Sequence, residues 1–355
     1  MDSVNKFNKV IIENLTKNKR FLFKRKSYIP RFAKMGKTFK KQGKIRAQLL
    51  KAEGITVPAI MILSITNDCN LNCAGCYACA QNREKEDELT IAEIESVIAE
   101  ATEIGVAILM IAGGEPLMKK GILDVVEKHD ECLFVMFTNG LMINGETLEK
   151  LKGIKNIISV VSLEGSKDVT DERRGEGVFD MAMAAINRMD ENDMLSGVSI
   201  TLTSKNYDEV MEREYLHSIQ KEGVAATFLI EYVPCQGDEE LCLSQEQKAD
   251  MNKRIDAYSK EFDMLIVPLP GDEDQYGGCL AAGRGFLHIS STGSLEACPF
   301  APYSDANIKH MPLKEALQSK LLKEVRENHH LLREGKGGCT LVANKEWIEN
   351  LAEGQ

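Results

Sequence analysis

The sequence predicts an α/β protein: an open, partial (β/α)6 barrel with a basic helical N-terminal extension and a small C-terminal domain that carries cysteines. Short apolar runs alternate six times with helical segments, which predicts a parallel sheet covered by helices. Beyond about residue 270, glycine-rich and cysteine-bearing segments replace this alternation. The expected parts are the extension at 1–53, the barrel at 54–235, a linker helix at 236–269, the small domain at 270–345 and a tail at 346–355.

The N-terminal extension is predicted to be helical. Pro30 and Gly36 are expected to interrupt it, and a second short helix is expected at 45–52. Apolar residues recur at helical spacing between lysines near the start of the chain, at Phe7, Ile11, Leu15 and Leu22.

The charge is divided unevenly along the chain. Residues 1–51 hold 16 Lys and Arg against 2 Asp and Glu, a net charge of +14, and because the whole chain carries −10 the remainder carries −24. Three interpretations of the basic segment stay open: a solvated helix, an interfacial helix on anionic lipid, or a surface for nucleic acid or an acidic peptide. We predict no specific nucleic-acid binding.

The barrel begins with a nearly continuous apolar run at 59–66, which is typical of a buried parallel strand. Thr90 with Glu93 three residues later predicts the start of the first helix, and Gly105 predicts its end. The other strands are expected at 106–111, 133–137, 157–162, 198–203 and 226–231, and the other helices at 119–129, 146–151, 179–191, 208–222 and 243–262.

Three cysteines follow the first strand with the spacing C-x3-C-x2-C: Cys69, Cys73 and Cys76. Thiolates bind iron–sulfur clusters, and three ligands to a four-iron cluster leave one iron open to a substrate. A zinc site that also uses Cys79 is the alternative. Because active-site loops of β/α barrels follow the carboxyl ends of strands, the position of this loop favours catalysis. Cys79 is interpreted as a bystander, with a fourth ligand or a redox-active thiol as the other options.

This loop resembles the signature of the radical S-adenosylmethionine (SAM) superfamily. The resemblance implies a TIM-like partial barrel in which Cys69, Cys73 and Cys76 hold a 4Fe–4S cluster. It also implies that SAM chelates the open iron and is cleaved by one electron to a 5′-deoxyadenosyl radical, so these cysteines are the expected catalytic residues. The residue before the last cysteine is often aromatic in the family. Gly75 stands there in this chain, with Tyr77 after the cysteine.

Loops after the next strands also resemble family motifs. A Gly-Gly-Glu-Pro run follows the second strand, Thr-Asn-Gly the third and Ser-x-Glu-Gly the fourth. Weaker matches are Arg173 or Arg174 and, around the end of the fifth strand, Thr201 and Asn206; a solvated surface arginine is the alternative at 173 and 174. The resemblance implies that SAM is bound by Gly113, Gly114, Glu115, Pro116, Thr138, Asn139, Ser162, Glu164, Arg173 and Thr201.

The C-terminal cysteines follow the pattern C-x13-G-x4-C and then Gly-Gly-Cys, which resembles the SPASM and Twitch extensions of radical SAM enzymes. The resemblance implies an auxiliary 4Fe–4S cluster of the shorter, Twitch type. Cys235 is the expected fourth ligand, with Cys242 or an open iron as alternatives. The full set of predicted metal ligands is Cys69, Cys73, Cys76, Cys279, Cys298, Cys339 and Cys235.

Composition and resemblance together suggest a cytoplasmic enzyme. The chain is 43% hydrophobic and 28% charged, with no apolar run long enough to span a membrane and no secretory signal. Contact with the membrane periphery through the basic segment is an additional expectation. The resemblance implies an electron donor such as ferredoxin or flavodoxin. The expected substrate is a peptide or protein, the alternative a lipid or small metabolite, and a non-enzymatic metal-binding module is the interpretation from a different class.

Overall fold

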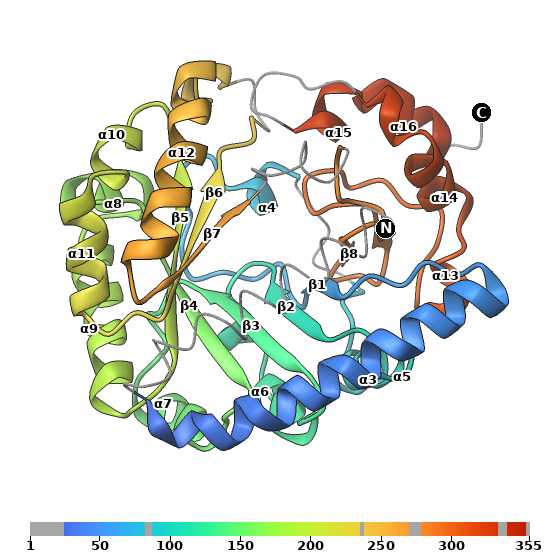
Figure 1. The fold of residues 1–355 in the computed structure, drawn as a ribbon, viewed down its shortest axis with the longest axis horizontal. Helices are drawn as coiled ribbons and strands as arrows, with labels where there is room; N and C mark the ends of the chain where they lie inside the picture. Colours follow the sequence, from blue (N-terminus) through green and yellow to red (C-terminus); the bar gives the residue numbers. More distant parts are fainter. Residues whose placement is uncertain (1–24, 82–86, 235–237, 270–277, 333–338, 353–355) are drawn as a thin grey trace.

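The protein is described from a computed structural model, which covers residues 25–81, 87–234, 238–269, 278–332 and 339–352. Its centre is one curled sheet with the strand order β7-β6-β5-β4-β3-β2-β1-β8-β9 (Figure 1). Neighbouring strands are parallel except for β8 and β9, which form an antiparallel pair. The strands are β1 (Ile60–Ser64), β2 (Ile108–Ala112), β3 (Leu133–Thr138), β4 (Ile157–Leu163), β5 (Ser196–Leu202), β6 (Ala226–Glu231), β7 (Leu265–Leu269), β8 (Phe286–Ile289) and β9 (Leu295–Glu296).

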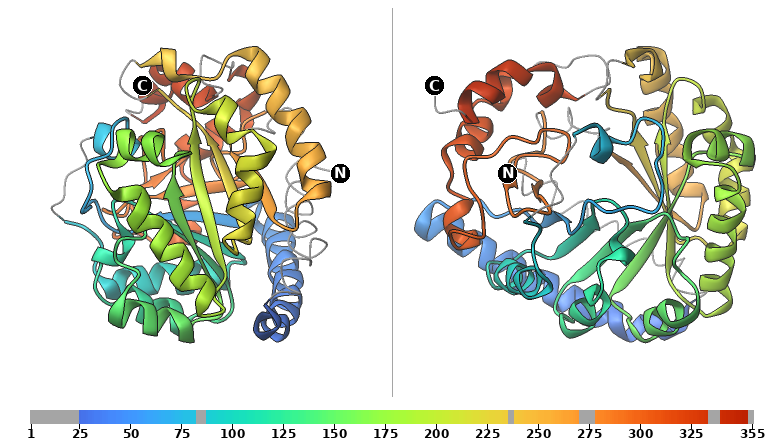
Figure 2. Two further views of the ribbon diagram at one scale, coloured as in Figure 1. Left: turned by 90° about the vertical axis from the view of Figure 1, so that its left-hand side faces the viewer. Right: turned by 180° about the vertical axis from the view of Figure 1, so that it is seen from behind.

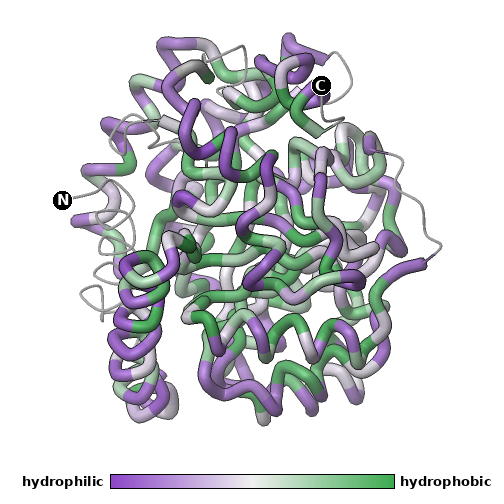
Figure 3. Tube along the Cα trace, turned by 90° about the vertical axis from the view of Figure 1, so that its right-hand side faces the viewer, coloured by the Kyte–Doolittle hydropathy of each residue, from purple (hydrophilic) through white to green (hydrophobic). Residues whose placement is uncertain are grey.

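Helices cover the outer side of this sheet (Figures 1 and 2). The strands at the centre of the molecule are largely hydrophobic, whereas the outer helices alternate hydrophilic and hydrophobic residues along their length (Figure 3). The helices of the barrel are α5 (Ile91–Glu103), α6 (Ile122–Lys128), α7 (Gly145–Gly153), α8 (Lys167–Arg174), α9 (Val178–Glu191), α10 (Tyr207–Val210), α11 (Arg213–Lys221) and α12 (Gln245–Glu261). The C-terminal helices are α13 (Leu313–Ala316), α14 (Lys320–Glu327), α15 (Thr340–Ala343) and α16 (Lys345–Ala352).

The six predicted strands are confirmed to within two residues at each end, and the predicted cap of α5 is confirmed in detail. The Thr90 side chain accepts a hydrogen bond from the backbone N–H of Glu93, whose carboxylate accepts one from the backbone N–H of Thr90. This capping box satisfies two backbone donors that the helix itself leaves unpaired. It starts a helix whose Ile94 and Ile98 are buried against the sheet.

Helix α3 (Ile29–Glu53) is a single helix of 25 residues, so the predicted interruptions at Pro30 and Gly36 are wrong. Pro30 lies in the first turn, where its missing N–H costs no hydrogen bond. Gly36 only lowers helix propensity, and burial of Met35 and Phe39 on either side of it outweighs this effect. The predicted helical character of residues 1–24 lies outside the described residues.

Helix α3 lies across the amino-terminal ends of the strands. Met35 and Phe39 share a buried cluster with Ile60 and Ile108, the first residues of β1 and β2. Gly105, which precedes β2, has a φ of +101° and leaves room for the α3 backbone, because a Cβ there would lie 2.7 Å from the carbonyl oxygen of residue 42. The amino end of the barrel is therefore closed by α3, and its carboxyl end faces the other way.

The C-terminal part extends the same sheet as the barrel. Strand β7 falls within the segment expected to be only a linker helix, and it pairs with β6. Strand β8 pairs with the free edge of β1, so the predicted boundaries at 235 and 270 do not coincide with a break in the sheet. Covering an open edge of β1 in this way removes unpaired backbone groups that a lone barrel would expose. In the described part of the chain, no helix has the length and apolar character needed to span a membrane.

Candidate functional site

The predicted cluster loop leaves the carboxyl end of β1 and ends at the short helix α4 (Tyr77–Ala80). The side chain of Cys69 is exposed, and those of Cys73 and Cys76 are half-buried. Burial raises the pKa of the Cys69 and Cys73 thiols, and the Arg174 guanidinium opposes this increase at both positions. The loop therefore places Cys69 and Cys73 where a bound metal, rather than the surrounding protein, would have to stabilise the thiolate form.

Cys79 belongs to the same thiol group. Burial and the neighbouring Cys76 thiol, which shares a hydrogen bond with it, raise the pKa of Cys79 to about 11. Within the described ranges, no group of three or more His, Cys, Asp or Glu side chains has the arrangement needed to hold a metal ion. The thiols of Cys69, Cys73 and Cys76 are neighbours in an accessible loop, and their donor chemistry fits an iron–sulfur cluster.

The Gly-Gly-Glu-Pro loop after β2 packs directly on the segment that leads to the cysteines. A Cβ on Gly113 would lie 2.3 Å from the Thr66 carbonyl oxygen, and one on Gly114 would lie 2.1 Å from the Asp68 carbonyl oxygen. The backbone N–H of Gly114 donates to the first of these oxygens at 2.7 Å, and that of Glu115 donates to the second at 2.8 Å. Both positions require glycine because any side chain would displace the cluster loop. Pro116 opens a short turn after them.

The Glu115 carboxylate is 1% exposed and joins two loops. It accepts hydrogen bonds from Thr138 Oγ1 at 2.7 Å and from the Asn139 backbone N–H at 2.8 Å. Burial raises its pKa, and these hydrogen bonds act in the opposite direction. The Asn139 side chain in turn donates to Asn70 Oδ1 at 2.6 Å. The loops after β1, β2 and β3 are thus linked, while the predicted contact of Glu115 with the SAM amino group stays a prediction.

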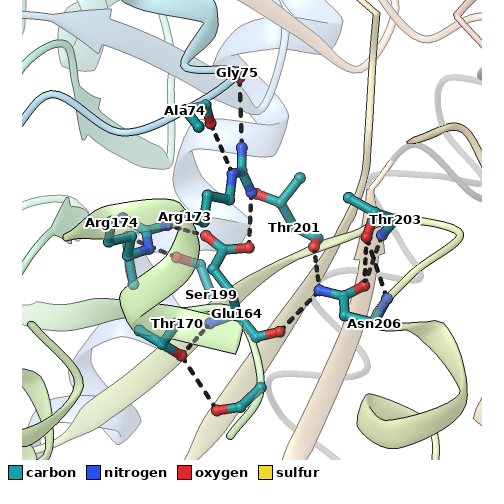
Figure 4. A network of polar contacts seen from close by, with 12 residues as sticks. Ala74, Gly75, Glu164, Thr170, Arg173, Arg174, Ser199, Thr201, Thr203 and Asn206 are labelled. Carbon is teal, nitrogen blue, oxygen red and sulfur yellow. Dashed lines mark hydrogen bonds and ion pairs between the residues drawn. The ribbon is translucent and has the colours of Figure 1, made fainter. Parts of the chain in front are cut away.

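The loop after β4 is anchored by a buried ion-pair group (Figure 4). Glu164 is 1% exposed and pairs with Arg173 at 2.7 Å and with Arg174 at 2.5 Å. Arg173 also donates to the carbonyl oxygens of Ala74 and Gly75, at 3.0 and 3.4 Å, within the cluster loop. Helix α8, which the sequence did not predict, carries both arginines. The contact predicted for Arg173 with the SAM carboxylate stays a prediction, but its position beside the cysteines is a property of the fold.

The predicted residues after β4 and β5 also lie at this end of the barrel. Ser162 and Ser199 share a hydrogen bond of 3.1 Å between their hydroxyl oxygens. The Asn206 amide donates to the backbone carbonyls of Glu164 and Thr201, at 2.8 and 2.9 Å, and so fastens the two loops together (Figure 4). Asn206, a weak match in the sequence, therefore has a clear structural role.

A buried polar chain that sequence reasoning missed borders the same region. Ser64, at the end of β1, lies 2.8 Å from His288 Nε2, and His288 Nδ1 lies 2.8 Å from the Glu296 carboxylate. All three side chains are buried. Ser64 is paired across the sheet with Ala112, which immediately precedes Gly113. His288 and Glu296 are far from the cysteine motif in the sequence. Only the pairing of β8 with β1 brings them to Ser64, so the sequence alone does not reveal these polar contacts.

The C-terminal cysteines are more deeply placed. Cys279, Cys298 and Cys339 are all buried, whereas Cys242 is half-buried. Cys235, the expected fourth ligand of the auxiliary cluster, lies outside the described residues.

The loop after Cys298 contacts helix α4, which directly follows the cluster loop. The rings of Tyr77 and Phe300 meet edge to face with centroids 5.1 Å apart, and the Gln81 amide donates to the Pro299 carbonyl at 2.5 Å. The fold therefore brings the first cysteine group beside the C-terminal hairpin.

Comparison with known proteins agrees with this geometry. The model of the radical SAM superfamily matches residues 63–213. The AdoMet-dependent heme synthase of Methanosarcina barkeri is 26% identical over 322 residues, which cover 81% of this chain and 89% of that protein. The mycofactocin maturase MftC of Mycolicibacterium smegmatis is 26% identical over 266 residues, which cover 70% of this chain and 66% of that protein.

Solved structures show the same fold. Streptococcus suis SuiB bound to S-adenosylmethionine superposes with a TM-score of 0.68 at 18% identity, covering 88% of this chain and 81% of SuiB. SuiB bound to its precursor peptide SuiA gives a TM-score of 0.67. The matched domain and the enzymes among the relatives show that this chain contains a radical SAM domain and is a SAM-dependent enzyme with a 4Fe–4S cluster, and the solved structures share its fold.

Proposed function

We propose that this enzyme removes a hydrogen atom from a peptide or protein substrate and so modifies or oxidises it. The supporting observation is the linkage of four loops at the carboxyl end of the barrel. Asn139 holds the cluster loop from the β3 side, and Arg173 holds it from the β4 side. Such a rigid frame suits chemistry that depends on the position of a reactive group.

Each residue of the frame has a proposed task. Cys69, Cys73 and Cys76 would hold the cluster, which when bound supplies the electron that cleaves SAM. Gly113 and Gly114 let the loop after β2 pack closely on the backbone that leads to the cysteines, and they would present backbone groups to bound SAM. Glu115, Thr138 and Asn139 fix the loop on one side of the cysteines, and the paired Glu164 fixes the other. We also propose Ser162 and Thr201 as polar contacts of SAM on the inner side of β4 and β5.

The peptide substrate is proposed from two relatives. MftC is named a maturase, and SuiB was solved with a precursor peptide in place. We propose that Cys279, Cys298, Cys339 and Cys235 hold the auxiliary cluster. Ferredoxin or flavodoxin would deliver the electron, and a cytoplasmic location would keep the thiols reduced.

A tetrapyrrole substrate is the second candidate. The heme synthase of Methanosarcina barkeri aligns with 81% of this chain and with 89% of its own length. This similarity gives the small-metabolite alternative a specific substrate class, the iron porphyrins, which are small molecules of defined size and charge.

Anaerobic reconstitution with iron and sulfide tests both the proposed SAM chemistry and the proposed substrate. We expect about eight irons per chain, four for each cluster, and 5′-deoxyadenosine after addition of SAM and dithionite. Peptides encoded beside the gene and a panel of iron porphyrins are then incubated separately, and products are found by mass spectrometry. Zinc at one ion per chain without SAM cleavage would overturn the cluster assignment. A product from the porphyrins alone would overturn the peptide substrate and leave the SAM chemistry standing.

A further inference from the structure

Helix α3 presents a row of exposed lysines to the outside of the molecule. Its exposed lysines follow one another at spacings of three or seven residues, apart from one adjacent pair, which places all of them within about one third of the helix circumference. They extend over 18 helical positions, from residue 34 to residue 51, which is a rise of about 25 Å. The row is called the lysine face and consists of Lys34, Lys37, Lys40, Lys41, Lys44 and Lys51.

Basic residues on the two sides of α3 are used differently. Arg46 is buried and donates to the Gly105 carbonyl oxygen, and Arg31 pairs with Asp130. Both arginines therefore fasten the helix to the barrel. On the lysine face Lys34 also pairs with Asp130, whereas the other five lysines form no ion pair with any acidic side chain within the described ranges. Their charge is available to a partner.

The negative charge of the rest of the molecule limits the orientation in which the lysine face can meet an anionic surface. Residues 1–51 carry a net +14 and the remainder −24, so most of the molecule is repelled by an anionic surface. The sole acidic residue of α3, Glu53, pairs with Lys314 at 2.8 Å. An anionic surface would thus meet the protein in one orientation, with α3 toward it.

We propose that the lysine face of α3 docks the enzyme on an anionic phospholipid surface. The apolar side of α3 is committed to the barrel through Met35 and Phe39, so the contact is electrostatic and does not require insertion of the helix. Ile29, in the first turn, is 44% exposed and lies eleven residues before Lys40, on the same side of the helix, so it can enter the interfacial region of a bilayer.

A membrane fits this face better than a nucleic acid does. Base readout combines arginine or lysine with asparagine and glutamine, and single-strand binding relies on aromatic stacking; of these residue types the lysine face offers lysine alone. Lysine is a compact point charge without a preferred planar partner. A straight row of such charges on a convex helix matches an extended anionic plane.

The position of α3 determines how a membrane contact would orient the functional site. The helix covers the amino ends of the strands, and the cluster loop leaves the carboxyl end of β1 (Figures 1 and 2). In Figure 2 the lysine-bearing helix and α4 lie on opposite sides of the barrel. Docking through α3 therefore leaves the site directed away from the lipid. The contact sets the location of the enzyme and does not deliver a lipid to it.

Vesicle sedimentation of the full reconstituted chain tests this proposal. Phosphatidylcholine vesicles with and without phosphatidylglycerol are compared at low and high salt. We expect binding only to the anionic vesicles and a loss of binding as salt screens the charges. The triple variant K37Q/K41Q/K44Q should bind roughly 100-fold more weakly, since each lysine near an anionic membrane contributes about fivefold. SAM cleavage should be unchanged within about twofold, because the lysines are remote from the site.

A matched control separates location from net charge. K221Q/K253Q/K260Q removes the same charge from exposed positions on α11 and α12, and it should bind vesicles like the parent. Equal loss in both triple variants, or parent-like binding by K37Q/K41Q/K44Q, would overturn the proposal. So would tighter binding to duplex DNA than to vesicles that disappears in K37Q/K41Q/K44Q. Residues 1–24 are present in every variant, so any contribution from them is common to all.

Discussion

The two groups of cysteines differ in how the fold holds them. Cys69, Cys73 and Cys76 fall within eight residues, in a half-exposed loop fastened from outside by Asn139 and Arg173. The C-terminal cysteines are spread over 61 residues of sequence, from 279 to 339, and are buried. A site that must admit SAM needs access, whereas burial suits a cluster that passes electrons or holds structure. The contrast predicts an exchangeable site and a closed one.

Removal of one cysteine from each group should have the largest effect and sharpens this contrast. Cys73→Ala is expected to abolish 5′-deoxyadenosine formation and to lower iron by about four per chain. Cys298→Ala should lower iron by the same amount but leave cleavage of SAM without substrate intact. Iron analysis and chromatography of 5′-deoxyadenosine measure the two outcomes. Loss of SAM cleavage in both variants would show that the two groups are not independent.

The anchor of the cluster loop provides the next largest effect. Glu164→Gln removes the charge that pairs with Arg173 and Arg174, and breaking a buried pair of this kind costs about 3 kcal/mol of unfolding free energy. Because Arg173 also holds Ala74, we expect weaker SAM binding as well.

Denaturant unfolding and calorimetric titration with SAM measure the two effects of Glu164→Gln. The control is Glu261→Gln, which breaks the exposed pair with Arg213 and should cost less than about 1 kcal/mol. Similar losses in the two variants would contradict the anchoring role.

The polar chain between β1 and the C-terminal hairpin tests how strongly the two regions are joined. Ser64→Ala leaves His288 Nε2 without its hydroxyl partner, a buried loss that costs about 1–3 kcal/mol. Thr292→Ala, in the turn of the same hairpin, is the comparison, because its half-buried hydroxyl lies beside the Ser290 hydroxyl. Unfolding free energies report the cost. If Ser64→Ala also lowers the iron content, the geometry of the hairpin depends on the Ser64–His288–Glu296 contacts. An unfolding free energy equal to that of the parent would show that these contacts contribute nothing to stability.

Sequence patterns predicted the regions that depend on local spacing. The cysteine motif, the Gly-Gly-Glu-Pro loop and the cap at Thr90 are each contained in a few residues, and their chemistry follows from residue type. The continuity of α3 through Gly36 could not be predicted in this way, because burial of Met35 and Phe39 against strand ends decides it. The chain Ser64–His288–Glu296 escaped for the same reason: its members meet only because β8 pairs with β1. The features that sequence patterns did not predict are therefore those that depend on contacts between residues far apart in the sequence.

The smallest expected effect lies where the two regions touch beside α5. The Leu89 backbone N–H donates to the Ser291 carbonyl at 2.7 Å, and the next residue is the Thr90 cap. Thr90→Ala should lower the unfolding free energy by about 1 kcal/mol at neutral pH. The hydrogen bonds from Thr90 lower the pKa of Glu93 below its ordinary 4.5, so they stabilise the folded protein above that pH. As the pH falls through the lowered value the carboxylate is protonated and this contribution disappears. The variant loses the Thr90 hydroxyl but keeps its backbone N–H, which also donates to Glu93. The difference between parent and variant should therefore shrink in acid by the share of the hydroxyl, as urea unfolding at several pH values would show. A constant difference would mean that the Thr90 hydroxyl does not stabilise the Glu93 carboxylate.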